Sequence, residues 1–242
     1  MYLENVVVDA LDPQRLGRFW EAVLGTERLT DEPAGFETRL TVEDGPVLDL
    51  CFQRVPEPVT PPTILGPRLH LDLHGPDQAA EVDRLLALGA EHVDIGQGDV
   101  PWVVLADPEG NPFCVLEERE VYAGTGLLAA LPLQSADPGR DVAFWSWLTG
   151  WPESGEAGPR ALRHPSGRGT FLELVPEPAP KGPVKNRLHL DVRLESGDNP
   201  DRVEAGILER GGRRLDPGWG ELPWVSYLDP SGNELCVLPA RG

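Results

Sequence analysis

The sequence predicts an α+β protein of two similar halves, each with two copies of a strand–helix–three-strand unit. The segment PWVVLADPEGNPFCVL at 101–116 matches PWVSYLDPSGNELCVL at 223–238 at ten of sixteen positions. RLHLD at 68–72 recurs at 187–191, again about 120 residues later. Repeats in the same order at one spacing indicate a tandem duplication of a single domain. We therefore predict one domain over 1–120, a linker over 121–126 and a second domain over 127–242.

The first unit begins with ENVVVDA at 4–10, a run rich in β-branched residues that predicts a strand. Asp12 and Pro13 then suit the N-cap and first turn of a helix. Apolar residues follow at helical spacing up to Gly25, which suits the helix end; they are Leu16, Phe19, Trp20, Val23 and Leu24. Strands are predicted at 36–42 and 47–55, with a shorter one before them.

The second unit repeats this order, and the second half repeats both units. RLHLDLH at 68–74 predicts a strand, and Asp77 opens a helix that ends at Gly89. The remaining strands of the unit are predicted at 91–95, 102–106 and 112–118. In the second half Asp137-Pro138 and Asn199-Pro200 open the corresponding helices.

Strand alternation separates an apolar face from a polar face. In RLHLDL the three leucines point one way, whereas Arg68, His70 and Asp72 point the other way. We expect the leucine faces to receive the helices and the polar faces to line a cup. Trp20 and Trp145 lie on the apolar stripe of their helices and are expected in the core.

Composition limits the classes of function. The chain has 21 Lys+Arg against 40 Asp+Glu, a formal charge of −19, which disfavours binding to nucleic acid or anionic membranes. No apolar run of about 18 residues suits a membrane span. The acidic N-terminal stretch does not resemble a signal peptide. Three cysteines at scattered positions do not resemble a disulfide framework, so we expect a cytoplasmic protein.

The early DP…FW…LG helix, the RLHLDL strand and the DPxGN turn occur in order in both halves. This pattern resembles the vicinal oxygen chelate superfamily, and within it the glyoxalase-like and bleomycin-resistance-like branch. The resemblance covers almost the whole chain. It implies two tandem glyoxalase-like domains, each of paired βαβββ units that form a half-open barrel around a pocket.

Metal-dependent members of this superfamily place ligands at four inward positions per domain. The resemblance maps these positions onto Asn5, Gln53, His70 and Cys114 in the first half and onto Ala130, Glu173, His189 and Cys236 in the second. Cysteine replaces the usual last-strand glutamate in both halves, and the first-strand histidine is missing. Amides are poor ligands for such a site. We therefore expect no metal or other cofactor; if one binds, it should be zinc on Glu173, His189 and Cys236.

Strand parity and the resemblance together predict a ligand pocket in each half. The first comprises Asn5, Gln53, Arg68, His70, Asp72, Trp102 and Cys114, and the second comprises Glu173, Arg187, His189, Asp191, Trp224 and Cys236. Each residue type also has a structural interpretation. The cysteines suit buried strand positions, the tryptophans suit the core, and each His–Asp pair suits a polar wall that an arginine neutralises.

Three functions are consistent with these residues. The first is a binding protein for a metabolite or drug-like molecule, without chemistry. The second is a metal-dependent lyase, isomerase or dioxygenase that uses the second-half pocket. The third is metal-free acid–base catalysis by His70–Asp72 or His189–Asp191. The sequence assigns no catalytic residue; the expected partner is a small molecule, and the chain is expected as a monomer or homodimer.

Overall fold

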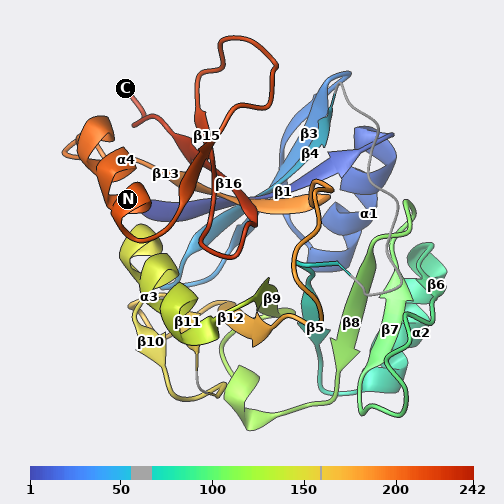
Figure 1. Cartoon of the computed structure of the whole chain (residues 1–242). Helices are drawn as coiled ribbons and strands as arrows, with labels where there is room; N and C mark the ends of the chain where they lie inside the picture. The colour runs from blue at the N-terminus through green and yellow to red at the C-terminus, as the bar shows by residue number, and fades with distance from the viewer. Residues whose placement is uncertain (56–66, 159) are drawn as a thin grey trace.

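The fold consists of two eight-stranded mixed sheets with helices packed around them (Figure 1). The computed structural model describes residues 1–55, 67–158 and 160–242. Sheet A has the order β14-β15-β16-β13-β1-β4-β3-β2, and sheet B has the order β10-β11-β12-β9-β5-β8-β7-β6. Among these residues, no helix is long and apolar enough to cross a membrane.

The first half of the chain contributes β1–β8, α1 and α2. Their bounds are β1 Tyr2–Ala10, α1 Pro13–Leu24, β2 Glu27–Glu32, β3 Gly35–Thr41, β4 Val47–Arg54, β5 Asp72–His74, α2 Gln78–Leu88, β6 Glu91–His92, β7 Val103–Ala106 and β8 Pro112–Leu116.

A short 3-10 helix, η1 (Glu120–Tyr122), then leads into the second half. The bounds there are β9 Leu128–Ser135, α3 Pro138–Thr149, β10 Glu153–Ser154, β11 Ala161–Arg163, β12 Phe171–Pro176, β13 Leu188–Arg193, α4 Pro200–Glu209, β14 Arg213–Leu215, β15 Val225–Leu228 and β16 Glu234–Leu238.

Each sheet combines one unit from each half of the chain. In sheet A the first unit joins the fourth, because β1 pairs antiparallel with β13. In sheet B the second unit joins the third, because β5 pairs antiparallel with β9. The α+β fold with two tandem βαβββ repeats is confirmed. The expectation that each half lines its own pocket is wrong, because each concave face draws its residues from both halves.

The predicted helix starts are confirmed in all four helices. The side chains of Asp12, Asp77, Asp137 and Asn199 each accept a hydrogen bond from the backbone N–H three residues further on. These caps satisfy an otherwise unpaired donor in the first turn. Two strand predictions were too long. The segment at 91–95 forms a strand only at Glu91–His92, and the one at 68–74 only at Asp72–His74, with an isolated bridge at Leu69.

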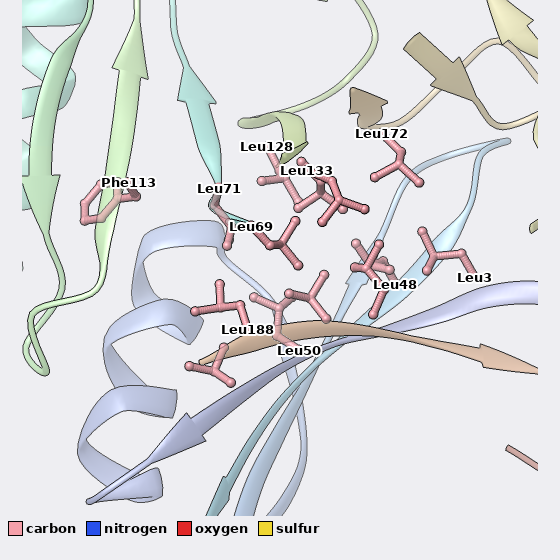
Figure 2. Close-up of a cluster of buried hydrophobic side chains, with 14 of the residues drawn as sticks. Leu3, Leu48, Leu50, Leu69, Leu71, Phe113, Leu128, Leu133, Leu172 and Leu188 are labelled. Atoms are coloured by element: carbon pink, nitrogen blue, oxygen red, sulfur yellow. The ribbon is translucent and has the colours of Figure 1, made fainter. Parts of the chain in front are cut away.

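The leucine faces of the two sheets pack against each other as well as against helices (Figure 2). Leu69 and Leu71 beside β5 lie opposite Leu48 and Leu50 of β4 in one continuous buried cluster. Trp145 belongs to the same cluster and is fully buried. The sequence correctly predicted which face of each strand is apolar, but not that a second sheet would cover much of it.

Both DPxGN segments are turns fixed by their own aspartate. Asp229 Oδ1 accepts hydrogen bonds from the backbone N–H groups of Ser231 and Asn233, at 2.9 and 2.8 Å. Its Oδ2 atom accepts from Asn233 Nδ2 at 2.9 Å and from Trp145 Nε1 at 3.2 Å. Gly232 has φ +84°, a conformation that glycine adopts without strain. Asp107 and Trp20 form the same contact at 3.2 Å, so this repeated motif is structural.

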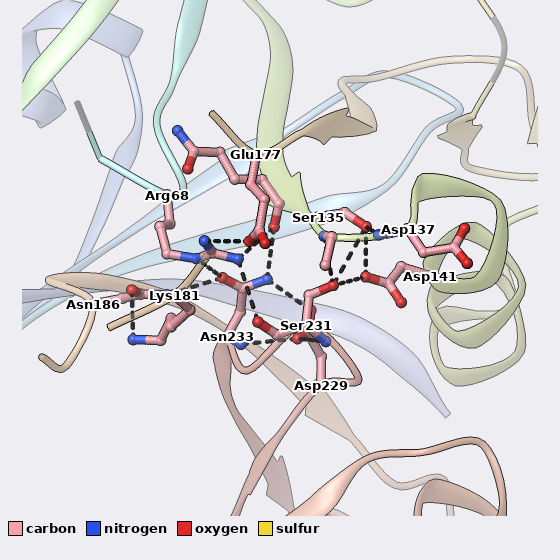
Figure 3. A network of polar contacts seen from close by, with 12 residues as sticks. Arg68, Ser135, Asp137, Asp141, Glu177, Lys181, Asn186, Asp229, Ser231 and Asn233 are labelled. Atoms are coloured by element: carbon pink, nitrogen blue, oxygen red, sulfur yellow. Dashed lines mark hydrogen bonds and ion pairs between the residues drawn. The ribbon is translucent and has the colours of Figure 1, made fainter. Parts of the chain in front are cut away.

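Arg68 lies in a polar network between the halves rather than beside Asp72 (Figure 3). Its guanidinium forms an ion pair with Glu177 at 2.7 Å and donates to Asn233 Oδ1 at 2.7 Å. Arg187, the equivalent residue of the second half, forms an ion pair with Glu109 of the first half at 3.0 Å. The interpretation in which each arginine neutralises the aspartate four residues further along its strand is therefore wrong.

Candidate functional site

The concave face of sheet A carries a row of polar side chains from three strands. Asn5 of β1 lies opposite Asp191 of β13, and Asp191 lies opposite Cys236 of β16. In the next row, Val7 of β1 lies opposite His189. Strand alternation turns all of these side chains to one face, since they occupy every second position of their strands.

A cavity of about 520 Å³ opens above this row. Its floor includes His189, Asp191 and Cys236, and its sides include Glu37, Cys51 and Gln53 from β3 and β4. The mouth is largely apolar, formed by Leu215, Pro217, Trp219, Leu222 and Trp224. An apolar opening above a few convergent polar groups is typical of a small-molecule site.

Trp219 reaches the cavity from the loop between β14 and β15. The loop turns at Gly218 and Gly220, whose φ angles are +75° and +83°, and both positions favour glycine. The Lys185 ammonium lies 5.2 Å from the centre of the Trp219 ring and forms an ion pair with Asp9 at 2.6 Å. This contact joins the loop before β13 to the loop after β14 at the cavity mouth.

His189, Asp191 and Cys236 bring their polar atoms to one point. His189 Nε2 lies 3.3 Å from Asp191 Oδ1 and 3.7 Å from Cys236 Sγ. Asp191 Oδ2 accepts a hydrogen bond from Asn5 Nδ2 at 3.1 Å, and Ser226 Oγ lies 3.5 Å from Cys236 Sγ. Asp191 Oδ1 is buried and has no hydrogen-bond partner among the described residues.

The charge distribution around His189 is strongly negative. Burial alone would lower the pKa of His189, but the close approach of Asp191 and Cys236, with their charges, outweighs it and raises the pKa to about 10. The pKa of the Cys51 thiol is raised well above its ordinary value, mainly by burial and then by Glu37. Cys51 is therefore a neutral thiol and a weak nucleophile.

Sheet B repeats the central part of this arrangement. His70 Nε2 lies 3.2 Å from Asp72 Oδ1, and polar atoms of His70, Asp72 and Cys114 lie within 4.8 Å of one another. Glu173 reaches the same face from β12. Burial and the charge of Asp72 raise the pKa of Glu173 to about 7, although His70 opposes the shift. Burial, followed by Asp72, also raises the pKa of Cys114.

Part of the linker packs against sheet B. Tyr122 of η1 is 6% exposed and packs edge-on against Phe171, with ring centres 6.2 Å apart. Cys114 and the partly buried Trp102 belong to the same apolar cluster. Tyr122 therefore belongs to the buried cluster on this face, whereas the His70 side chain remains 22% exposed.

The structure divides the predicted site residues differently from the sequence. Six of them line the sheet A cavity; they are Asn5, Gln53, His189, Asp191, Trp224 and Cys236. Four gather on sheet B, namely His70, Asp72, Cys114 and Glu173. The predicted zinc set of Glu173, His189 and Cys236 is not brought together, because Glu173 lies on sheet B and the other two residues lie on sheet A.

Residues at these two faces that were not assigned to a site from the sequence include Glu37, Cys51, Trp219 and Tyr122. Strand parity places Cys51 on the same face as Gln53, so that signal was present in the sequence. The glycines on both sides of Trp219 are a signal for an exposed aromatic loop. Nothing in the linker sequence indicates that Tyr122 would fold back onto a sheet.

Comparisons with known proteins agree with a tandem fold of two similar halves. A sequence profile of the Glyoxalase-like domain matches residues 5–116 and again 130–238. Glyoxalase I from Zea mays superposes with a TM-score of 0.64 at 16% identity, over 98% of this chain and 92% of that one. Its V278E mutant superposes with a TM-score of 0.66 at 17% identity, over 98% of this chain and 92% of that one. The cppA protein from Streptococcus pneumoniae TIGR4 superposes with a TM-score of 0.50 at 15% identity, over 99% of this chain and 98% of that one.

The superpositions show a common fold, and identities of 15–17% do not transfer an activity. No curated protein matches the sequence.

Proposed function

The chain belongs to the glyoxalase-like domain family of the vicinal oxygen chelate superfamily over both of its halves, and from this premise we propose that it binds a small organic molecule in the sheet A cavity. The observation that carries the proposal is the cavity of about 520 Å³ with an apolar mouth and a polar floor. Sites for small ligands commonly enclose about 300–1,000 Å³.

The lining favours a flat, partly aromatic ligand. Trp219 and Trp224 both line the cavity, and tryptophan rings can stack on planar groups. At the side wall, Glu37 accepts hydrogen bonds from Thr30 Oγ1 at 3.2 Å and from Gln53 Nε2 at 3.4 Å. No lysine or arginine of the described residues forms an ion pair with Glu37, so a donor group on the ligand has a ready acceptor there.

A thermal-shift screen of aromatic metabolites, followed by tryptophan fluorescence titration, tests the proposal. A ligand at 100 times its dissociation constant should add about 2.7 kcal/mol to the free energy of unfolding. Trp224→Ala should weaken binding about two- to tenfold, given the roughly 0.5–1.5 kcal/mol that a stacked aromatic contact contributes. Trp102→Ala, the equivalent position in the other half, is the matched control and should leave affinity unchanged. Equal losses in both variants would contradict the choice of cavity.

Metal-dependent catalysis in the same cavity is the second candidate function. It is favoured by the convergence of His189, Asp191 and Cys236 on its floor. Imidazole, carboxylate and thiolate are the ligands that zinc prefers, and the unpartnered Asp191 Oδ1 has a free lone pair, so these residues fit such an ion. When bound, a zinc ion would polarise a substrate oxygen or activate a water. The protein would contribute the orientation of the substrate by the tryptophan-lined mouth.

Turnover separates the two candidates. A compound that stabilises the protein should be recovered unchanged if the chain is a binding protein. If the chain is a lyase, isomerase or dioxygenase, the compound should be converted, and the conversion should require added divalent metal.

A further inference from the structure

We infer that the groove between α1 and α2 is a second ligand site, which binds an aromatic ring that carries a carboxylate. The groove has a volume of about 630 Å³, and its described lining residues are all different from those of the sheet A cavity. The lining includes Arg15, Arg18, Phe19 and Ala22 of α1, Leu88 at the end of α2, and Pro108 of the DPEGN turn. The inference therefore goes beyond the proposed function and does not depend on it.

The tandem repeat provides an internal comparison, because α3 and α4 of the second half correspond to α1 and α2. The FW pairs align α3 with α1, and the N-cap residues align α4 with α2. Figure 1 shows the two helix pairs on opposite sides of the molecule. The alignment places Trp147 at the position of Ala22, and Arg210 at the position of Leu88.

In the second half an aromatic side chain lies between the two helices. The centre of the Trp147 ring is 4.2 Å from the Arg210 guanidinium carbon. The ring also packs so closely on Gly206 that a Cβ atom at this position would lie 2.5 Å from it, so only glycine admits the ring. Trp147 thus identifies the chemical group that this helix pair accommodates, which is a flat aromatic ring against a guanidinium.

In the first half no side chain replaces this ring, and the groove is open. Ala22 is exposed and contributes only a methyl group, and Leu88 is 39% exposed. Arg84, at the position of the second-half glycine, donates to the carbonyl oxygens of Ala22 and Val23 at 3.5 and 3.0 Å. A ligand ring in the groove would cover Ala22 and Leu88 as the indole covers the equivalent surface of the second half.

The first-half groove also offers a cation that the second half does not. Arg18 forms an ion pair with Asp31 at 3.0 Å, but Arg15 is exposed and forms no ion pair among the described residues. The equivalent of Arg15 is Arg140, which forms an ion pair with Asp141 at 2.7 Å. The position of Arg18 is an alanine in the second half. Because a guanidinium pairs with a carboxylate in a bidentate geometry, Arg15 favours an anionic group on the ligand.

The position of Arg15 suits a carboxylate that is attached to the ring. Arg15, Phe19 and Ala22 follow one another at intervals of four and three residues, so they lie along one face of α1. Among the described lining residues only Asp12 is acidic, and its side chain accepts a hydrogen bond from the Arg15 backbone N–H at 3.1 Å as the helix N-cap. A bicyclic aromatic acid therefore fits with its ring against Ala22 and its carboxylate at Arg15.

An NMR titration of the full chain, followed through its backbone amides, tests the inference with naphthoate and its neutral analogue naphthamide. Naphthoate should shift the amide signals of Arg18 and Gly89. It should bind about two- to fivefold more tightly than naphthamide, the difference that an exposed ion pair produces, and Arg15→Gln should remove this difference. Ala22→Trp, which supplies the ring of the second half, should abolish the shifts. Ala79→Trp, at an exposed position near the start of α2, is the matched control and should retain them.

Three outcomes would overturn the inference. They are no shifts at Arg18 and Gly89 in the wild type, shifts that survive Ala22→Trp, or equal affinities of the wild type for the two probes. Far-ultraviolet circular dichroism checks that each variant is folded, and Ala22→Phe replaces Ala22→Trp if the tryptophan variant is not. Binding in the sheet A cavity would shift the amides of Cys51 and Ser226 instead. Failure at the groove therefore leaves the proposed function standing, and failure at the cavity leaves the groove site standing.

Discussion

Arg68 from the first half of the chain donates a hydrogen bond to Asn233 Oδ1 in the second half, over 2.7 Å. Asn233 belongs to the turn that Asp229 fixes, so the arginine ties sheet B to a hairpin of sheet A. Arg187 and Glu109 form the reciprocal connection. In each half, the arginine of RLHLD thus contacts the DPxGN turn of the opposite half. This contact explains why the two motifs recur together.

Arg68→Ala should therefore lower the free energy of unfolding. The Arg68 and Glu177 side chains are only 11% and 12% exposed, and removal of one partner from a buried ion pair costs about 3–5 kcal/mol. Arg160→Ala is the control, because it breaks an ion pair with Glu153 in which both side chains are nearly half exposed. The control should lose at most about 1 kcal/mol. Urea unfolding followed by tryptophan fluorescence gives both values.

Trp145→Phe isolates the contact between the FW helix and the DPxGN turn. Phenylalanine retains most of the buried ring but removes the Nε1 donor to Asp229 Oδ2. Loss of one donor to a buried carboxylate should cost about 1–3 kcal/mol. Trp147→Phe, on a partly exposed position beside Arg210, is the comparison and should cost about 1 kcal/mol or less. Equal losses would mean that packing alone, without the hydrogen bond, determines the effect.

Glu173 should make stability fall as pH rises from about 4.5 to 7. Its pKa is about 7 in the folded protein against an ordinary value of 4.5, so the folded state binds more protons over this range. The free energy of unfolding therefore decreases with pH, by up to about 3 kcal/mol from this group. Glu173→Gln does not titrate, so its stability relative to wild type should increase from pH 4 to pH 8. Urea unfolding in the presence of chelator measures this; a difference independent of pH would contradict the prediction.

Tyr122 should stabilise the packing of the linker against sheet B. Tyr122→Ala removes a buried ring from the contact with Phe171 and should cost about 3–5 kcal/mol. Tyr122→Phe retains the ring and should cost clearly less. If Tyr122→Ala remains folded, it should also bind aromatic probes on sheet B that the wild type does not bind. Unchanged stability in the alanine variant would mean that the linker lies on the sheet without supporting it.

Local features of the fold were predictable because they depend on short-range physics. The caps at Asp12 and Asp137 follow from which side chains satisfy free N–H groups in the first helical turn. The shared face of His189 and Asp191 follows from the two-residue period of a strand. The inward position of Cys236 was expected from the family resemblance instead, and Cys236 lines the sheet A cavity.

Long-range pairing was not predictable in the same way. Units one to four have closely similar patterns, so nothing in the strand at 187–193 indicates whether it joins the third unit or the first. The assignment of Glu173 to the same site as His189 failed for this reason. Arg68 was misplaced because its long side chain turns away from the strand toward Asn233, a contact that alternation along one strand does not describe.

The pairing of the first strand with the fourth unit also affects how the protein can be made. Asn5 and its hydrogen-bond partner Asp191 are 186 positions apart. At about 5–20 residues per second, a ribosome supplies that partner roughly 10–40 s after the first strand is synthesised. During this interval the nascent chain has an open strand edge where the last unit will later bind. Sheet A, which contains the first strand β1, is therefore complete only when the fourth unit has been synthesised and β13 pairs with β1.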